Sequence, residues 1–447
     1  MTVNKSRSID GRWWIHGDDK PCHYGVLSFD PESGLELVVK IPQDRTVGDA
    51  LHKMFQAQKV PLVDPNGVSL PTDTSDLDVP KVIHGRDEHN YPVTLFGCSC
   101  LGPGVSTGLD SYRIDSLAAI LNFCGDSWSK ARFQSVRVSY SLLHDWMNWN
   151  AITKHVCHPN PASLEYKNKE RREFTLDEHA RLAIEGHTLF GQSATNFTLN
   201  FVHYVEFEFD SPIPVKVIQD DYVLVFLQLL CLLTGENVFI EEMLFWDSAQ
   251  PQYAPASLPA DLLRANPGIA GAKKHKHADG MVASFAELEG NFGGIVKRWF
   301  ECHTQLEPVS DLYFIVLRNL VGPIGSQFLL LAQALEVYHA RSFPGNKRFD
   351  QRIQKILDLH PSEAAKLTEG ISDFAMKVYN TRNYLTHYDE KTRQSGKVAE
   401  GNDLVRVTYA LKGLLLVCFL KELGIQGNPI DRVLRKYASM RFVSLDP

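Results

Sequence analysis

A segment near residue 380 of this 447-residue chain contains the residue types best suited to chemistry at a phosphate group. It reads Tyr-Asn-Thr-Arg-Asn-Tyr-Leu-Thr-His from residue 379 and includes Arg382, Asn383 and His387. An arginine can hold two phosphate oxygens at once, and a histidine exchanges a proton near neutral pH. These three residues are the candidate catalytic residues.

The segment lies in a stretch, 368–388, whose pattern predicts a helix. Its apolar positions recur at helical spacing through Ile371, Phe374, Ala375, Val378 and then Leu385. Arg382 falls on this apolar stripe, where a hydrophobic residue is expected, and its guanidinium group cannot lose its charge. It must therefore bind an anion or another chain. The alternative is a structural Arg382 paired with an acidic residue such as Glu336, with His387 capping the helix end.

Helical spacing also bears on how the three residues act together. Asn383 and His387 are four residues apart and share a face, whereas Arg382 and His387, five apart, point about 140° away from each other on an ideal helix. One copy of the helix therefore does not direct both side chains into one cleft. Two copies meeting across a dimer would bring both pairs into one groove.

Similar Arg–His spacings occur elsewhere, so the spacing alone does not identify a site. The chain contains six such pairs: Arg45/His52, Arg137/His144, Arg172/His179, Arg181/His187, Arg298/His303 and Arg382/His387. Four of them lie in the half of the chain that we expect to be β-rich. The remaining competitor, Arg298/His303, is helical but lacks the following Asn and precedes most of the predicted helices.

The elements around these residues predict an α+β protein with a β-rich front and an all-α end. Residues 25–29 and 35–41 flank a turn and predict a hairpin. Further strands are expected at 91–97, 136–143 and 238–246. Residues 200–210 alternate, with Phe207 and its apolar neighbours on one side and Glu206 and Glu208 on the other, as in a half-buried strand. A short buried helix is expected at 223–233.

We expect a domain boundary after these strands. Residues 251–280 are rich in Pro and Gly and contain the run Lys-Lys-His-Lys-His from residue 273, which is typical of a linker or exposed loop. Helices are then predicted at 281–303, 309–320, 325–341, 347–359, 368–388, 403–423 and 428–438. The expected organisation is a β-rich domain at 1–250, a linker at 251–280 and an all-α domain at 281–447.

On these residues the chain resembles the ApeA-type anti-phage proteins. The Arg-Asn followed by His late in a helical domain resembles the R-x4–6-H motif of HEPN ribonucleases. The apolar stretch 328–343 and the front half, with Gly11-Arg12-Trp13-Trp14 and His84-Gly85, resemble that family's helical and N-terminal domains. The resemblance implies a HEPN-like nuclease domain, a homodimer formed through it, and an N-terminal sensor or regulatory domain that meets a phage-derived trigger.

The resemblance also implies a reaction. RNA carries its own nucleophile, the 2′-hydroxyl, so a metal-independent endoribonuclease needs only proton transfer and charge stabilisation, and leaves a 2′,3′-cyclic phosphate. Arg382 would bind the phosphate, His387 would act as general acid or base, and Asn383 would orient His387 or bind the phosphate. Lys377, Lys391 and Arg393 flank the motif and are the expected RNA-binding residues. No metal or cofactor is expected, and the response would be abortive infection.

Composition and charge agree with the division into a β-rich front part and an all-α C-terminal part. Residues 377–447 hold 12 Lys and Arg against 7 Asp and Glu, although the whole chain has a net charge of −7. A polyanion is therefore expected at the C-terminal end. The eight cysteines suggest no disulfide framework, and Cys98/Cys100, His155/Cys157/His158 and Cys22/His23 lack the spacing of a zinc site. With no signal peptide and no apolar run of membrane-spanning length, a cytoplasmic protein without a membrane segment is expected.

Two other functions remain open at this point. The first is a non-catalytic HEPN-like module that dimerises or binds nucleotides. The second is a β-rich binding protein on a helical scaffold, whose function would map to residues 1–250.

Overall fold

The computed structural model describes residues 6–17, 23–41, 82–106, 109–149, 152–156, 163–166, 171–192, 197–247, 259–264, 276–318, 320–343, 345, 347–388, 390–394 and 396–439. The chain forms two compact units. The first comprises residues 1–141, 151–224 and 239–271, and the second comprises 142–150, 225–238 and 272–447. The predicted α+β class is confirmed, with an antiparallel sheet in the front part and helices in the C-terminal part.

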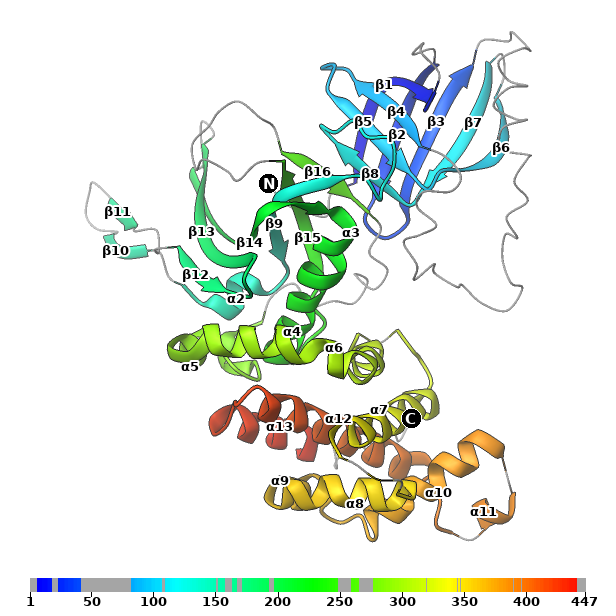
Figure 1. Ribbon diagram of the computed structural model, residues 1–447, viewed down its shortest axis with the longest axis vertical. Coiled ribbons are helices and arrows are strands. Elements are labelled where there is room, and N and C mark those ends of the chain that lie inside the picture. Colours follow the sequence, from blue (N-terminus) through cyan, green and yellow to red (C-terminus); the bar gives the residue numbers. More distant parts are fainter. Residues whose placement is uncertain are drawn as a thin grey trace. The chain divides into compact units, whose positions relative to one another are not determined.

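The first unit is built on an antiparallel sheet (Figure 1). Its order among the described strands is β12-β13-β14-β9-β15-β16-β8-β5-β4-β1-β2-β3-β7-β6, and β10 and β11 pair separately. The strands are β1 (Arg7–Ile15), β2 (His23–Asp30), β3 (Gly34–Ile41), β4 (Ile83–Asp87), β5 (Pro92–Phe96), β6 (Ser99–Ser106), β7 (Leu109–Ser116), β8 (Ala118–Leu121), β9 (Arg132–Tyr140), β10 (Ile152–Val156), β11 (Ser163–Tyr166), β12 (Arg172–Thr175), β13 (Ala180–Gln192), β14 (Phe197–Pro214), β15 (Ile240–Trp246) and β16 (Ala260–Leu263).

The predicted hairpin is present as β2 and β3, with Asp30 opposite Gly34. The Asp30 carboxylate accepts hydrogen bonds from the backbone N–H groups of Glu32 and Ser33, at 3.0 and 2.9 Å, and so closes the turn. Gly34 has a φ of 101°, which glycine adopts without the steric cost of a side chain. Turn chemistry and flanking apolar strands together determine this part of the fold.

Part of the predicted linker is wrong in the described residues. Ala260–Leu263 form β16, which pairs with β15 and β8 within the sheet. Leu262 and Leu263 are buried there, so this piece is part of the core rather than an exposed loop. Of the basic run from residue 273, the first three residues lie outside the described part of the chain. Lys276 is largely buried, and its ammonium group lies 2.7 Å from Glu236.

The second unit is helical, and α7 lies at its centre, packed against α6, α8, α10 and α12 (Figure 1). Its longer helices are α6 (Phe292–Leu317), α7 (Ile324–Ser342), α8 (Phe349–Leu359), α9 (Pro361–Leu367), α10 (Phe374–His387), α12 (Gly401–Glu422) and α13 (Asn428–Ser439). Shorter helices are α2 (Leu143–Met147), α5 (Phe285–Leu288) and α11 (Glu390–Gln394), together with the single turns η3 (Ala278–Gly280) and η4 (Glu289–Asn291). Phe328, Leu331, Ala332 and Leu335 of α7 are fully buried, so this helix presents the predicted core face.

Two segments of the front half belong to the second unit. These are residues 142–150, with α2, and residues 225–238, with most of α4 (Leu224–Thr234). The helical segment α3 (Val215–Val217), η2 (Ile218–Val223) and α4 is the one described stretch long and apolar enough to cross a membrane. Its most apolar window is 67% buried inside the protein, as in the core helix of a soluble protein.

Candidate active site

Arg382, Asn383 and His387 all lie on α10, which packs its buried face against α7 and α8. Phe374, Ala375 and Val378 form that face, as the apolar stripe predicts. The next buried position is Thr381 rather than Arg382. The Thr381 hydroxyl donates to the Lys377 carbonyl oxygen at 2.7 Å and accepts from the Ala399 N–H at 2.8 Å. These bonds allow a polar residue to continue the core and leave Arg382 at its edge.

The guanidinium of Arg382 is held between α7 and α8. It lies 3.7 Å from the Glu336 carboxylate on α7 and above the ring of Phe349 on α8, 5.7 Å from the ring centroid. Its side chain is 39% exposed, so a ligand can reach it. Glu336 also lies 3.5 Å from Arg352 on α8, so that one carboxylate serves two guanidinium groups.

His387 is the last residue of α10 and is exposed. The helix ends at Tyr388, which has a left-handed backbone with a φ of 51° and donates its N–H to the Tyr384 carbonyl oxygen. Tyr388 is 69% exposed, and its ring lies edge-on to Tyr384 with centroids 5.8 Å apart. An exposed aromatic residue with a strained backbone therefore directly follows the histidine.

No hydrogen bond or ion pair joins Arg382, Asn383 and His387 to one another within the described single chain. This agrees with the five-residue spacing of Arg382 and His387 on one helix. The two side chains are accessible but separate, and the chemistry that needs both requires either movement or a second copy.

Two of the three expected RNA-binding residues have acidic partners. Lys377 lies 3.0 Å from Asp403 and is largely buried. The Arg393 guanidinium lies 2.6 Å from Glu400 and also stacks on the Tyr384 ring. Lys391 is exposed on α11. The local charge at Lys377 and Arg393 is therefore balanced by protein groups.

The competing pair Arg298/His303 is occupied by structural contacts. Arg298 lies 3.6 Å from the Glu422 carboxylate, and the ring of His303 shares a hydrogen bond of 2.8 Å with the Gln228 side chain. His303 also packs against Trp299, and burial lowers its pKa. Both residues therefore have structural contacts that help to pack α6.

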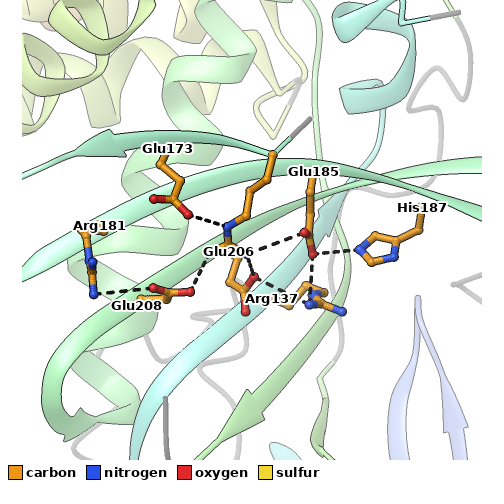
Figure 2. A network of polar contacts seen from close by, with 8 residues as sticks. Arg137, Glu173, Arg181, Glu185, His187, Glu206 and Glu208 are labelled. Carbon is orange, nitrogen blue, oxygen red and sulfur yellow. Dashed lines mark hydrogen bonds and ion pairs between the residues drawn. The ribbon is translucent and has the colours of Figure 1, made fainter. Parts of the chain in front are cut away.

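Two of the other Arg–His pairs, Arg137/His144 and Arg181/His187, include residues of a polar network on one face of the sheet (Figure 2). Arg137 lies 3.0 Å from Glu185, His187 lies 2.8 Å from the same carboxylate, and Arg181 lies 3.8 Å from Glu208. Arg171 is the centre of the network and contacts Glu206 and Glu208, each at 2.5 Å. The network ties β9, β13 and β14 together.

Glu206 is the member of this network for which the alternating sequence pattern of residues 200–210 gave a wrong prediction. The pattern predicts a solvent-facing side chain, yet Glu206 is 2% exposed. Arg171 and Arg137 cover it and balance its charge. A buried carboxylate of this kind is stable only with such partners.

The cysteine and histidine motifs form no metal site in the described residues. Cys98 is a buried free thiol, and burial raises its pKa to about 12. Cys22, Cys157 and His158 lie outside the described residues. In the part of the chain that is described, no three His, Cys, Asp or Glu side chains are grouped so as to hold a metal ion.

The chain has a β-sheet unit in its front part, followed by helices that present an Arg-Asn-x3-His motif at their surface. This is the arrangement expected of a HEPN-type protein with an attached β-rich domain. The family models agree with this class. ApeA N-terminal domain 1 matches residues 8–299, and Apea-like HEPN matches residues 329–428. The chain belongs to the ApeA family and is an anti-phage defence protein with a HEPN nuclease-type domain. None of the curated proteins or solved structures compared with the chain matches it.

Proposed function

We propose that this protein is a metal-independent endoribonuclease that cleaves cellular RNA during phage infection and so stops growth. The observation that carries the proposal is the position of the motif. Arg382 is anchored by Glu336 yet accessible, and His387 stands exposed at the end of the same helix. The match of residues 329–428 to the Apea-like HEPN model supports it.

The residues suit cleavage by the substrate's own 2′-hydroxyl. The 2′-oxygen attacks the adjacent phosphorus, the bond from phosphorus to the 5′-oxygen breaks, and a 2′,3′-cyclic phosphate and a 5′-hydroxyl result. The proton of the 2′-hydroxyl passes to a base, and the departing 5′-oxygen takes up a proton. His387 can serve in either transfer, and Arg382 can stabilise the charge on the phosphate oxygens. Asn383 would orient His387 or donate a hydrogen bond to the phosphate.

We further propose that the working form is a homodimer in the cytoplasm, joined through the helical unit. Two copies of α10 facing each other would place Arg382 of one copy and His387 of the other against one phosphate. The sheet-containing unit would meet the phage-derived trigger and hold the nuclease inactive until then.

One observation favours a second candidate, a HEPN-like module without catalysis. The ion pair between Arg382 and Glu336 is the contact that a structural role for Arg382 requires. In that case the module would only dimerise or bind nucleotides.

The test is induced expression of the wild type, Arg382→Ala, His387→Ala and Arg298→Ala, with and without phage. Cellular RNA is sequenced after ligation with and without prior 5′-phosphorylation, which maps 5′-hydroxyl ends. We expect the Arg382 and His387 variants alone to lose protection and cleavage at unchanged protein levels. Wild-type behaviour of both variants would contradict the nuclease proposal and favour the non-catalytic module.

A further inference from the structure

The turn from α7 into α8 carries a group of basic residues next to the motif. Lys347 and Arg348 precede α8, and Arg352 and Lys355 lie on it, three residues apart and therefore on one face. We call these four residues the α7–α8 basic cluster. The Arg352 side chain donates to the Lys347 carbonyl oxygen at 2.8 Å, which ties the turn to the helix.

Acidic side chains balance only part of this charge. Arg348 pairs with Asp350 through two contacts of 2.6 and 2.7 Å. Arg352 shares the single carboxylate of Glu336 with Arg382. Lys347 and Lys355 have no acidic partner within the described ranges. The two lysines thus add positive charge that no acidic side chain in the described ranges pairs with.

A buried histidine next to the cluster lacks a hydrogen-bonding partner. His339 of α7 is fully buried, and neither ring nitrogen has a hydrogen bond in the described structure. Burial lowers its pKa, and the nearby charges of Arg352, Lys347 and Lys355 lower it further. An unsatisfied buried polar group is costly, and the charged groups that act on this one are all cations. The three cations that act on His339 make the electrostatic environment of this turn positive.

The cluster adjoins the motif through two contacts between α8 and α10. The Arg348 guanidinium lies over the Tyr379 ring at 5.5 Å, one helical turn before Arg382. Phe349, the next residue, lies under the guanidinium of Arg382. The start of the α7–α8 basic cluster therefore lies next to Arg382.

We propose that Lys347 and Lys355, on a turn that Arg352 ties to α8, form a phosphate-binding subsite that holds the RNA backbone beside the phosphate bound by Arg382. This inference rests on the proposed ribonuclease function and assigns the backbone to α8. It replaces the expectation from the sequence that Lys377 and Arg393, both paired with acids, bind the RNA.

The experiment measures binding of a fluorescein-labelled single-stranded RNA of 20 nucleotides to the full-length chain by anisotropy, over a range of salt concentrations. All variants are made on His387→Ala, so that the RNA stays intact. Lys347→Gln with Lys355→Gln removes two cations from the subsite. Lys297→Gln with Lys366→Gln removes two exposed cations from α6 and α9 and serves as the matched control. Thermal unfolding of each variant confirms that it is folded.

We expect the subsite variant to bind about tenfold more weakly near 150 mM salt. The slope of the logarithm of affinity against the logarithm of salt should fall by about 1.4, because each lost contact to single-stranded nucleic acid removes about 0.7. The control should match the parent in both quantities.

Two results would overturn the inference. The first is a subsite variant with the parent's affinity and salt slope. The second is a larger loss in Lys377→Gln with Arg393→Gln than in the subsite variant. Cleavage by the chain with an intact motif is measured separately, so the subsite can fail while the nuclease stands. If the intact chain neither binds nor cleaves RNA, both proposals fail.

Discussion

Replacing Arg382 by alanine separates catalysis from structure, because the contacts of this residue limit what its loss can do to stability. Its ion pair with Glu336 is partly exposed at 3.7 Å, and such pairs contribute about 0–1 kcal/mol. Its position over the Phe349 ring adds about 0.5–1 kcal/mol. Glu336 keeps Arg352 at 3.5 Å, so the substitution leaves no unpaired carboxylate. We expect Arg382→Ala to lower the free energy of unfolding by about 1 kcal/mol.

The effect on cleavage should be far larger. Removing one donor that stabilises developing charge in a transition state typically lowers the rate about 100- to 1,000-fold. The assay pairs single-turnover cleavage of a defined RNA with urea unfolding of the same preparation. A loss of about 1 kcal/mol leaves nearly all molecules folded, so instability cannot account for a loss of rate of that size.

Arg298→Ala is the matched control. Arg298 also makes a partly exposed ion pair, with Glu422 at 3.6 Å, and that carboxylate keeps the Tyr338 hydroxyl at 3.1 Å. We expect a similar small loss of stability and unchanged cleavage. The reasoning is refuted if Arg382→Ala cleaves at the wild-type rate, or if it unfolds with a loss of several kcal/mol and its rate falls only in proportion to the folded fraction.

Three further predictions concern other sites. Tyr388→Gly should raise the free energy of unfolding by about 1 kcal/mol, since glycine adopts a φ of 51° without strain. If the exposed Tyr388 ring stacks on an RNA base, the same substitution should slow RNA cleavage, and equal or faster cleavage would contradict that role. Arg171→Met should lower the free energy of unfolding, measured in urea, by about 3 kcal/mol, because it removes an ion-pair partner of the buried Glu206. Arg181→Met, which removes an exposed arginine, should lower it by less than about 0.5 kcal/mol, and equal decreases in the two variants would show that the network is not organised around Glu206. Burial lowers the pKa of Lys412 to about 8, so between pH 8 and 10.5 the unfolded chain holds a proton on this lysine that the folded chain has lost, and the free energy of unfolding should rise with pH. Relative to Lys412→Met, the wild type should gain about 1–2 kcal/mol of stability from pH 8 to 10. A stability difference between the two proteins that does not change with pH would show that Lys412 does not titrate in this window.

Local pattern determines much of this fold. The apolar stripe of 325–341 predicts α7 nearly to its ends, because a helix that buries one face repeats its apolar residues at that spacing. The prediction was wrong at α6, because helices were expected at 281–303 and 309–320, whereas one helix, Phe292–Leu317, runs through Pro308. Buried neighbours on both sides, Leu306 and Val309, hold that helix together despite the lost hydrogen bond.

The motif was recognisable from the sequence, whereas its surroundings were not, because they depend on contacts between distant elements. Arg382, Asn383 and His387 were selected among six Arg–His pairs by their place on a late helix and by the resemblance to the HEPN motif. Asp403 neutralises Lys377 only because the first turn of α12 lies near α10, and no local pattern predicts that approach. The α7–α8 basic cluster was not singled out from the sequence, because its nearness to Arg382 appears only when α8 packs on α10.

The shared carboxylate explains how Arg382 can be both ordered and available. A guanidinium with its own buried acid would have to break that pair, and leave a charge unpaired, before it could bind a phosphate. Glu336 lies at 3.5 Å from Arg352 and at 3.7 Å from Arg382, so it remains paired when a phosphate takes Arg382 away. Replacing Glu336 by glutamine should therefore loosen Arg382 without removing any phosphate-binding group. On this argument the variant keeps its affinity for RNA and loses cleavage rate, whereas a purely structural ion pair predicts that neither quantity changes in the folded protein.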